Sequence, residues 1–130
     1  MNDKAIEQEI QAKGLTAPRI TPADLQANIA SEHYFTAGEG VWGSEVIVCG
    51  TPVTNETSLN LLTFCVLILK NGFTVTGESA CASSENFDAE IGRKIAKQNA
   101  EQKIWPLMGY ELKERLHQLT LPAQSPAKQE

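Results

Sequence analysis

The clearest pattern of apolar and polar positions lies in residues 62–80, where two β-favouring runs flank Asn71-Gly72. An Asn-Gly pair between such runs is typical of a β-hairpin with a two-residue turn, because both turn positions need positive φ. Closing this turn on Lys70 and Phe73 fixes the register of the two strands. The predicted core-facing pairs are Phe64 with Ser79, Val66 with Gly77, and Ile68 with Val75.

The opposite face of the predicted hairpin is half apolar and half polar. Its pairs are Cys65 with Glu78, Leu67 with Thr76, and Leu69 with Thr74. Such a face is either thinly covered or a contact surface. The candidate partner-binding residues on it are Cys65, Leu67, Thr76 and Glu78. In this register Ile68 belongs to the core, so Ile68→Asp should unfold the domain.

Two helices are predicted before the hairpin. Residues 3–13 contain good helix formers, but their apolar stripe is only Ile6 and Ile10, so we expect loose or partner-dependent attachment. The sequence TPAD at residues 21–24 combines a capping threonine, a proline at the first helical position and an acid in the place of a capping box. The second helix should end near Ala30 and carry Leu25 and Ile29 inward.

A first strand at residues 33–36 and a long helix complete the pattern. The long helix should end at Trp105, because Pro106 interrupts it, and a further helix is expected at about residues 107–119. Small and apolar residues share one broad side of the long helix, which lets it lie close to the sheet. These residues are Ala89, Ile91, Gly92, Ile95, Ala96 and Ala100.

Together these elements predict an α+β fold, with a short antiparallel sheet of three or more strands and the long helix packed on one face. The order α-β-β-β-α is similar to that of a double-stranded RNA-binding domain. Residues 1–20 are expected to form a loosely attached helix and linker, residues 21–119 a single domain, and residues 120–130 a disordered tail. Residues 37–58 favour either a mobile loop or an inserted hairpin, and their role stays open.

The sequence GEGVWG at residues 38–43 matches the G-x-G-x-x-G pattern of dinucleotide-binding turns. That function needs a helix to open at the glycines, so that its amides meet the pyrophosphate. The following residues 44–53 are instead β-like and contain a proline. We therefore predict a loop here and expect no cofactor.

Composition narrows the classes of function. The 130 residues carry 11 basic and 16 acidic side chains, a net charge of -5, which disfavours nucleic-acid binding through bulk electrostatics. The N-terminal sequence has no signal-peptide pattern, and no run approaches the ~20 apolar residues of a membrane span. An odd set of three cysteines at positions 49, 65 and 81 predicts a reduced cytoplasm rather than a disulfide framework.

Cys81 is the one candidate nucleophile that the sequence offers. Its nominal helpers are Glu78, Ser79, His33 and His117. No base or electropositive setting for a thiolate is visible, and a small buried thiol beside a helix start is commoner. The histidines and cysteines also lack metal-binding spacing. We therefore expect no enzyme and no metal site, and leave the reactivity of Cys81 open.

The basic start of the long helix carries a nucleic-acid alternative. In double-stranded RNA-binding domains the last helix opens with a basic pair, then alanine and lysine, and grips phosphates. Arg93, Lys94 and Lys97 stand at those spacings. The competing interpretation is a solvated, salt-bridged face, with Glu90 pairing Lys94 and Glu101 pairing Lys97.

The sequence GESACASSENFD at residues 77–88 joins the hairpin to the long helix. We predict a structural turn, in which Gly77 faces the packed helix. In that turn the unpaired helix amides bond to Ser79, Ser84, Asn86 or Asp88. The alternative is an anion site at the same amides, formed with Ser83, Ser84 and Asn86.

Four motifs, LKNGF, GESAC, NFDAEIGRKIA and WPLMGY, lie within residues 62–116. Through them the chain closely resembles a family of small proteins encoded by tailed phages and prophages, named for products forty-nine and sixty-six of two podophages. The resemblance implies a phage or prophage origin and action in the bacterial cytoplasm, and it carries no activity or catalytic residue. We expect a non-catalytic accessory protein that binds a host or phage protein or a small ligand, with nucleic-acid binding as the alternative and homo-oligomerisation left open.

Overall fold

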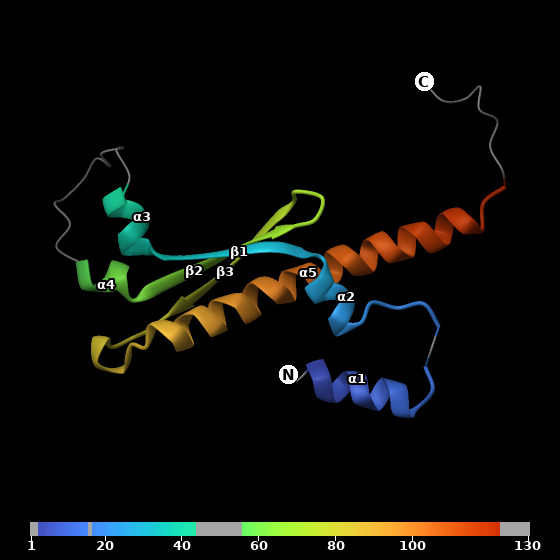
Figure 1. Ribbon diagram of the computed structural model, residues 1–130, viewed down its shortest axis with the longest axis horizontal. Coiled ribbons are helices and arrows are strands. Elements are labelled where there is room, and N and C mark those ends of the chain that lie inside the picture. Colours follow the sequence, from blue (N-terminus) through green and yellow to red (C-terminus); the bar gives the residue numbers. More distant parts are fainter. Residues whose placement is uncertain (1–2, 16, 44–55, 123–130) are drawn as a thin grey trace, which may run out of the picture.

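The computed structural model describes residues 3–15, 17–43 and 56–122. A three-stranded antiparallel sheet in the order β1-β2-β3 lies against a long helix, α5, which extends past the end of the sheet (Figure 1). The elements are α1 (Asp3–Ala12), α2 (Pro22–Ala27), β1 (Ile29–Thr36), α3 (Ala37–Gly43), α4 (Glu56–Asn60), β2 (Leu62–Leu69), β3 (Thr74–Ala80), the 3-10 turn η1 (Ser84–Asn86) and α5 (Ala89–Leu119). The α+β class and the order α-β-β-β-α are confirmed.

The hairpin turn has three residues rather than two. The Gly72 amide donates to the Leu69 carbonyl at 2.9 Å, and the Leu69 amide donates to the Phe73 carbonyl at 2.8 Å. Gly72 takes a φ of 90°, and no non-glycine residue in the described part of the chain has positive φ. Since only the last loop residue is left-handed, the turn is of the three-residue type.

This turn moves the register by one residue, so the predicted faces of β2 are inverted. Leu67 pairs with Val75, and Cys65 pairs with Gly77. Cys65 and Leu67 have no exposed surface, so their prediction as a partner-binding surface is wrong. Ile68 lies on the other face and is only half-buried, so its placement in the core is wrong too.

Helix α5 packs closely on β2 and β3 through small side chains. Its fully buried positions are Gly92, Ala96, Ala100 and Ile104. Two residues predicted on the same side, Ile91 and Ile95, are 55% and 42% exposed. The contact stripe is therefore narrower than the predicted broad side.

Pro106 lies inside α5 and does not end it. The two predicted helices are one helix of 31 residues. A proline removes one helical hydrogen bond and costs roughly 3 kcal/mol in a helix interior. Ile104 is fully buried, and Trp105 and Met108 pack on the core, so tertiary contacts hold the helix together across the proline.

The N-terminal half departs from the prediction mainly at element ends. The predicted capping box of α2 is confirmed, with hydrogen bonds between Thr21 and Asp24 in both directions. Ile29 begins β1 instead of ending α2, and β1 extends well beyond the predicted residues 33–36.

Residues 37–58 were predicted as a loop or hairpin, and the described part of them is helical. The glycine-rich residues 38–43 form most of α3, which is a helix and not a loop. Its start is capped by Thr36 and Glu39, each side chain bonding the other's amide. The β-like residues 44–53 and the predicted tail residues 123–130 lie outside the described residues.

Candidate functional site: the open face of the sheet

The sheet has one face under α5 and one face turned away from it. Strand alternation and register place a single set of side chains on the second face, which we call the open face. It consists of Ser31, His33, Phe35, Leu62, Phe64, Val66, Ile68, Thr74, Thr76, Glu78 and Ala80. The buried hydrophobic residues of the sheet all belong to the α5 side. The candidates Thr76 and Glu78 are exposed on the open face, opposite to Cys65 and Leu67, with which they were predicted to share a face.

Apolar side chains run along the centre of the open face. Phe64, Val66 and Ile68 follow one another on β2 and are each half-buried. Phe35 on β1 is 38% exposed and stacks on Phe64, with ring centroids 5.3 Å apart. Helix α3 lies at this end of the face, where Gly40 approaches the Phe35 ring. The result is an apolar strip bordered by hydroxyls and two ionisable side chains.

The α5 side of the sheet carries a polar cluster that fastens β1 to α5. The Glu32 carboxylate accepts a hydrogen bond from the Tyr34 hydroxyl at 2.9 Å and pairs with the Lys97 ammonium at 2.9 Å. The Lys97 pair, and then the Tyr34 hydroxyl, lower the pKa of Glu32. The same contact with Glu32 raises the pKa of Lys97. Burial raises the pKa of Tyr34.

This cluster lies beside the thiol of Cys65. Burial raises the pKa of Cys65, which keeps it a neutral thiol. The Tyr34 and Lys97 side chains likewise keep their protons and Glu32 keeps its charge at neutral pH. Groups whose pKa values move away from neutrality are poorly suited to proton transfer, so the cluster is suited to holding β1 against α5.

Cys81 is half-buried at the start of the loop after β3. Its thiol donates a hydrogen bond to the Ser83 carbonyl at 3.1 Å. Within residues 3–15, 17–43 and 56–122, no cluster of three or more histidine, cysteine or acidic side chains has the geometry of a metal site.

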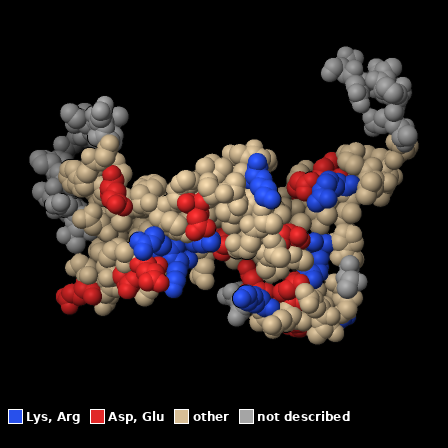
Figure 2. Space-filling view, viewed as in Figure 1, with Lys and Arg blue, Asp and Glu red and all other residues tan. Residues whose placement is uncertain are grey.

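The basic residues at the start of α5 are mixed with acids. Lys94 pairs with Glu90 at 3.2 Å, as predicted. Lys97 pairs with Glu32 rather than with Glu101, whose carboxylate accepts a hydrogen bond from Gln26 at 2.6 Å. Figure 2 shows basic and acidic side chains interspersed over the visible surface. Two of the three predicted phosphate-binding cations are therefore already paired with carboxylates.

The junction before α5 has its own internal hydrogen bonds. The Asp88 side chain accepts from the Ile91 amide at 3.0 Å and so caps α5, which is one of the predicted caps. Ser83 accepts from the Glu85 amide and caps η1. Ser84 and Asn86 are exposed. The predicted anion site thus has a carboxylate at its centre, which would repel an anion.

A wide groove of about 900 Å³ lies between the hairpin turn, the segment before α2 and the C-terminal half of α5. Its lining mixes apolar side chains with charges of both signs. These include Leu69, Phe73, Leu107, Met108, Arg19, Asp24, Glu111 and Arg115.

Residues 20–116 match the phage protein family named for N4 Gp49 and phage Sf6 gene 66. The chain belongs to this family. The match takes in the whole sheet and α5 almost to its end, which confirms the predicted resemblance. No curated protein and no solved structure matches the chain. None of the helices in the described ranges combines the length and apolar character that a bilayer span requires.

Proposed function

We propose that this member of the phage protein family is a non-catalytic accessory protein that binds a host or phage protein in the bacterial cytoplasm. Family membership supports the phage origin. The open face supports protein binding, because its apolar side chains are contiguous and only half-buried, and apolar patches that stay accessible to solvent mark interaction sites. The single observation that carries the proposal is the apolar strip of Phe64, Val66 and Ile68, beside Phe35, on a sheet face turned away from α5.

The chemistry of the open face favours a protein partner. Its ionisable side chains are His33 and Glu78. The only cation near them in the described residues, the Lys103 ammonium of α5, is paired with Glu78 at 3.9 Å. Nucleic-acid surfaces need cations to contact phosphates. An apolar strip with a border of threonines resembles the dry core and polar rim of a protein interface.

Affinity capture from infected cells tests the proposal. Tagged wild-type protein, Val66→Glu and Lys94→Ala should be compared by quantitative mass spectrometry. The expected result is one protein recovered with the wild type and with Lys94→Ala but lost with Val66→Glu, while all three variants keep the same melting temperature. Recovery of the same proteins by all three variants, or of none by any, contradicts it.

The nucleic-acid alternative rests on Arg93, Lys94 and Lys97 and on the order of the elements. Gel shifts with duplex RNA and DNA separate the two functions. True phosphate contacts would give an affinity that falls steeply with salt and with alanine at these positions. Lys94 and Lys97 already have carboxylate partners. We therefore expect weak nucleic-acid binding whose affinity does not change when Arg93, Lys94 or Lys97 is replaced by alanine.

A further inference from the structure

Helix α1 is held to the rest of the protein by few contacts. None of its residues is fully buried, and Ile6 is 40% exposed. Figure 1 shows α1 as a separate short helix, set apart from the sheet and joined to α2 by a connecting segment. A helix of this length is marginal in water on its own, so its attachment depends on the surface that it faces.

That surface is a groove that α1 does not fill. Ile6 and Ile10 of α1, together with Ile20, Pro22 and Trp105, line a hollow of about 310 Å³ that is open to solvent. This is roughly the volume of ten water molecules. We call the surface formed by Arg19, Ile20, Pro22, Gln102 and Trp105 the α1 groove.

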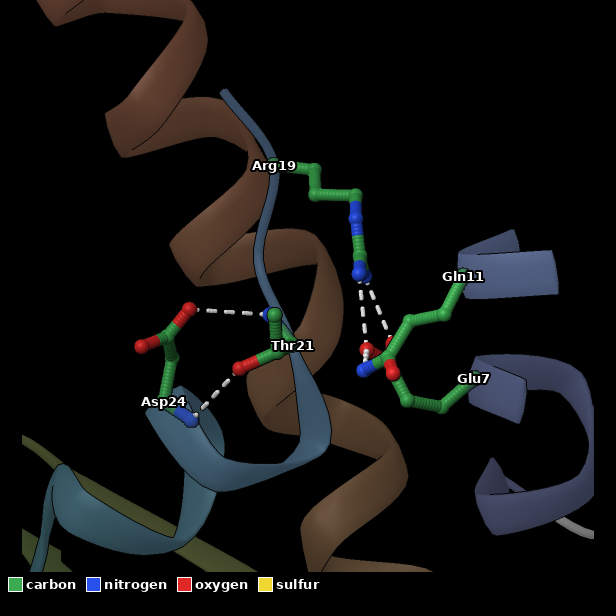
Figure 3. Close-up of polar contacts among 5 residues, drawn as sticks. All are labelled: Glu7, Gln11, Arg19, Thr21 and Asp24. Carbon is green, nitrogen blue, oxygen red and sulfur yellow. Dashed lines mark hydrogen bonds and ion pairs between the residues drawn. The ribbon is translucent and has the colours of Figure 1, made fainter. Parts of the chain in front are cut away.

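An ion pair fixes one side of α1 to the α1 groove. The Arg19 guanidinium donates to both carboxylate oxygens of Glu7, at 2.6 and 2.7 Å, and the Gln11 amide donates to the same carboxylate at 2.7 Å (Figure 3). The side chains of Arg19 and Glu7 are only 25% and 15% exposed. A two-pronged pair of this kind specifies both the charge and the orientation of what binds.

We propose that the α1 groove is a binding site for an amphipathic helix of a partner protein, and that α1 occupies it only until that helix displaces it. This site lies at the α2 and α5 side of the molecule, and it does not depend on the function proposed for the open face.

The groove indicates the chemistry of the partner helix. The partner helix should carry two apolar side chains one turn apart, as α1 carries Ile6 and Ile10. A carboxylate that binds Arg19 should directly follow the first of them, as Glu7 follows Ile6. Those two apolar side chains should be larger than isoleucine, because the hollow that Ile6 and Ile10 border leaves room for additional apolar atoms. A swapped α1 from a second copy would bring the same isoleucines and leave the same hollow, so it has no advantage over the chain's own helix.

A peptide probe tests this site in the full chain. The probe has the sequence of residues 3–14 with Ile6→Phe and Ile10→Leu. The chain carries Trp42→Phe, so that Trp105 alone reports binding by fluorescence. We expect saturable binding that is roughly tenfold tighter than that of the unmodified peptide, since the larger side chains fill the hollow.

Two substitutions in the chain make the test specific. Arg19→Glu should weaken the probe roughly tenfold, and a probe that also carries Glu7→Arg should regain the loss. The double substitution Ile6→Ser and Ile10→Ser in the chain should weaken the attachment of its own α1. The affinity for the probe should then rise, because α1 no longer competes for the groove. A structural role for α1 alone would not predict this gain.

Three results would overturn the proposal. The first is that the probe causes no saturable change in Trp105 fluorescence in the Ile6→Ser, Ile10→Ser chain, although that chain melts at the wild-type temperature. The second is probe binding that ignores the charge reversal at Arg19. The third is global unfolding of the Ile6→Ser, Ile10→Ser chain, which would make α1 part of the core.

Discussion

A Cβ placed on Gly77 would lie 2.9 Å from the Cα of Ala100 and closer still to the backbone of α5. Real Cβ atoms do not approach backbone atoms so closely, so the glycine is what lets α5 rest on β3. Ala96 and Ala100 are themselves fully buried at this contact. The three small residues set the distance between helix and sheet, and hence how well the rest of the core closes.

Gly77→Ala should lower the free energy of unfolding by about 3 kcal/mol, because the added methyl forces α5 away from the sheet. Urea denaturation measures this loss. Gly109→Ala is the matched control, since a Cβ there meets nothing within 4 Å and the residue lies within α5. It should raise stability by up to about 1 kcal/mol, as alanine favours a helix interior. If Gly77→Ala and Gly109→Ala were equally stable, β3 and α5 would not lie as close together at Gly77 as described.

Leu67→Asp and Ile68→Asp test the register of the hairpin. Leu67 is fully buried beneath α5, so an aspartate there should abolish cooperative unfolding. Ile68 is half-buried on the open face, where an aspartate reaches water, and the loss should stay below about 2 kcal/mol. Thermal denaturation followed by circular dichroism distinguishes the two variants. If Ile68→Asp destabilised the protein more than Leu67→Asp, the predicted two-residue turn would be correct instead.

The hairpin shows where prediction from sequence succeeds and where it fails. Asn71-Gly72 correctly places a turn, because local backbone preference decides that a turn forms. A two-residue turn and a three-residue turn with only Gly72 left-handed both suit this dipeptide. The choice between them depends on which face of β2 meets α5, a contact between residues far apart in sequence. Cys65 and Leu67 were therefore assigned to the wrong face.

Asp88→Ala should lower stability by about 1 kcal/mol, because it removes the N-cap of α5. Ser84→Ala and Asn86→Ala should change stability by less than about 0.5 kcal/mol, since both residues are exposed. Denaturation of the three variants tests the structural role of the junction. Calorimetric titration with nucleotides tests the anion alternative, which would gain support from micromolar binding lost with Ser84→Ala and Asn86→Ala at an unchanged melting temperature.

The contribution of the Lys97–Glu32 ion pair to the free energy of unfolding should be constant over a range of pH and should fall at both the acid and the alkaline end. Glu32 has a lowered pKa, so its contribution is complete above the ordinary value of about 4.3 and is lost as the pH falls through the lowered value. Lys97 has a raised pKa, so its contribution is complete below about 10.4 and is lost as the pH rises through the raised value. The pair is partly exposed, so the change should stay under about 1 kcal/mol.

Urea denaturation across pH measures both limits. Glu32→Gln and Lys97→Met should each remove both limits that this pair contributes, because each partner is the main cause of the other's pKa shift. Arg115→Met is the control, because its pair with Glu111 is about 60% exposed and lies within α5 alone. A control variant with the same loss as Lys97→Met would show that the pair does not fasten β1 to α5.

The helix caps were readable in the sequence and one of them was missed. Thr21 and Asp24 predicted the start of α2 correctly, and Thr36 and Glu39 have the same spacing at the start of α3. The glycines of residues 38–43 obscured that second signal, because glycine disfavours a helix interior. The apolar strip of the open face, in contrast, could not be found before the register of β2 was known. The ion pair of Glu7 with Arg19 depends on how α1 folds back, which no local pattern specifies.

Photo-crosslinking in infected cells tests most directly whether the open face is the functional surface. A photoreactive phenylalanine analogue should replace Thr76, which is exposed on that face, and in a separate protein Lys94, which is exposed on α5. The proposed function predicts a discrete higher-mass adduct from position 76 that disappears when Val66→Glu is added, with no adduct from position 94. An adduct from position 94 alone, or an adduct from position 76 that survives Val66→Glu in a folded protein, would contradict it.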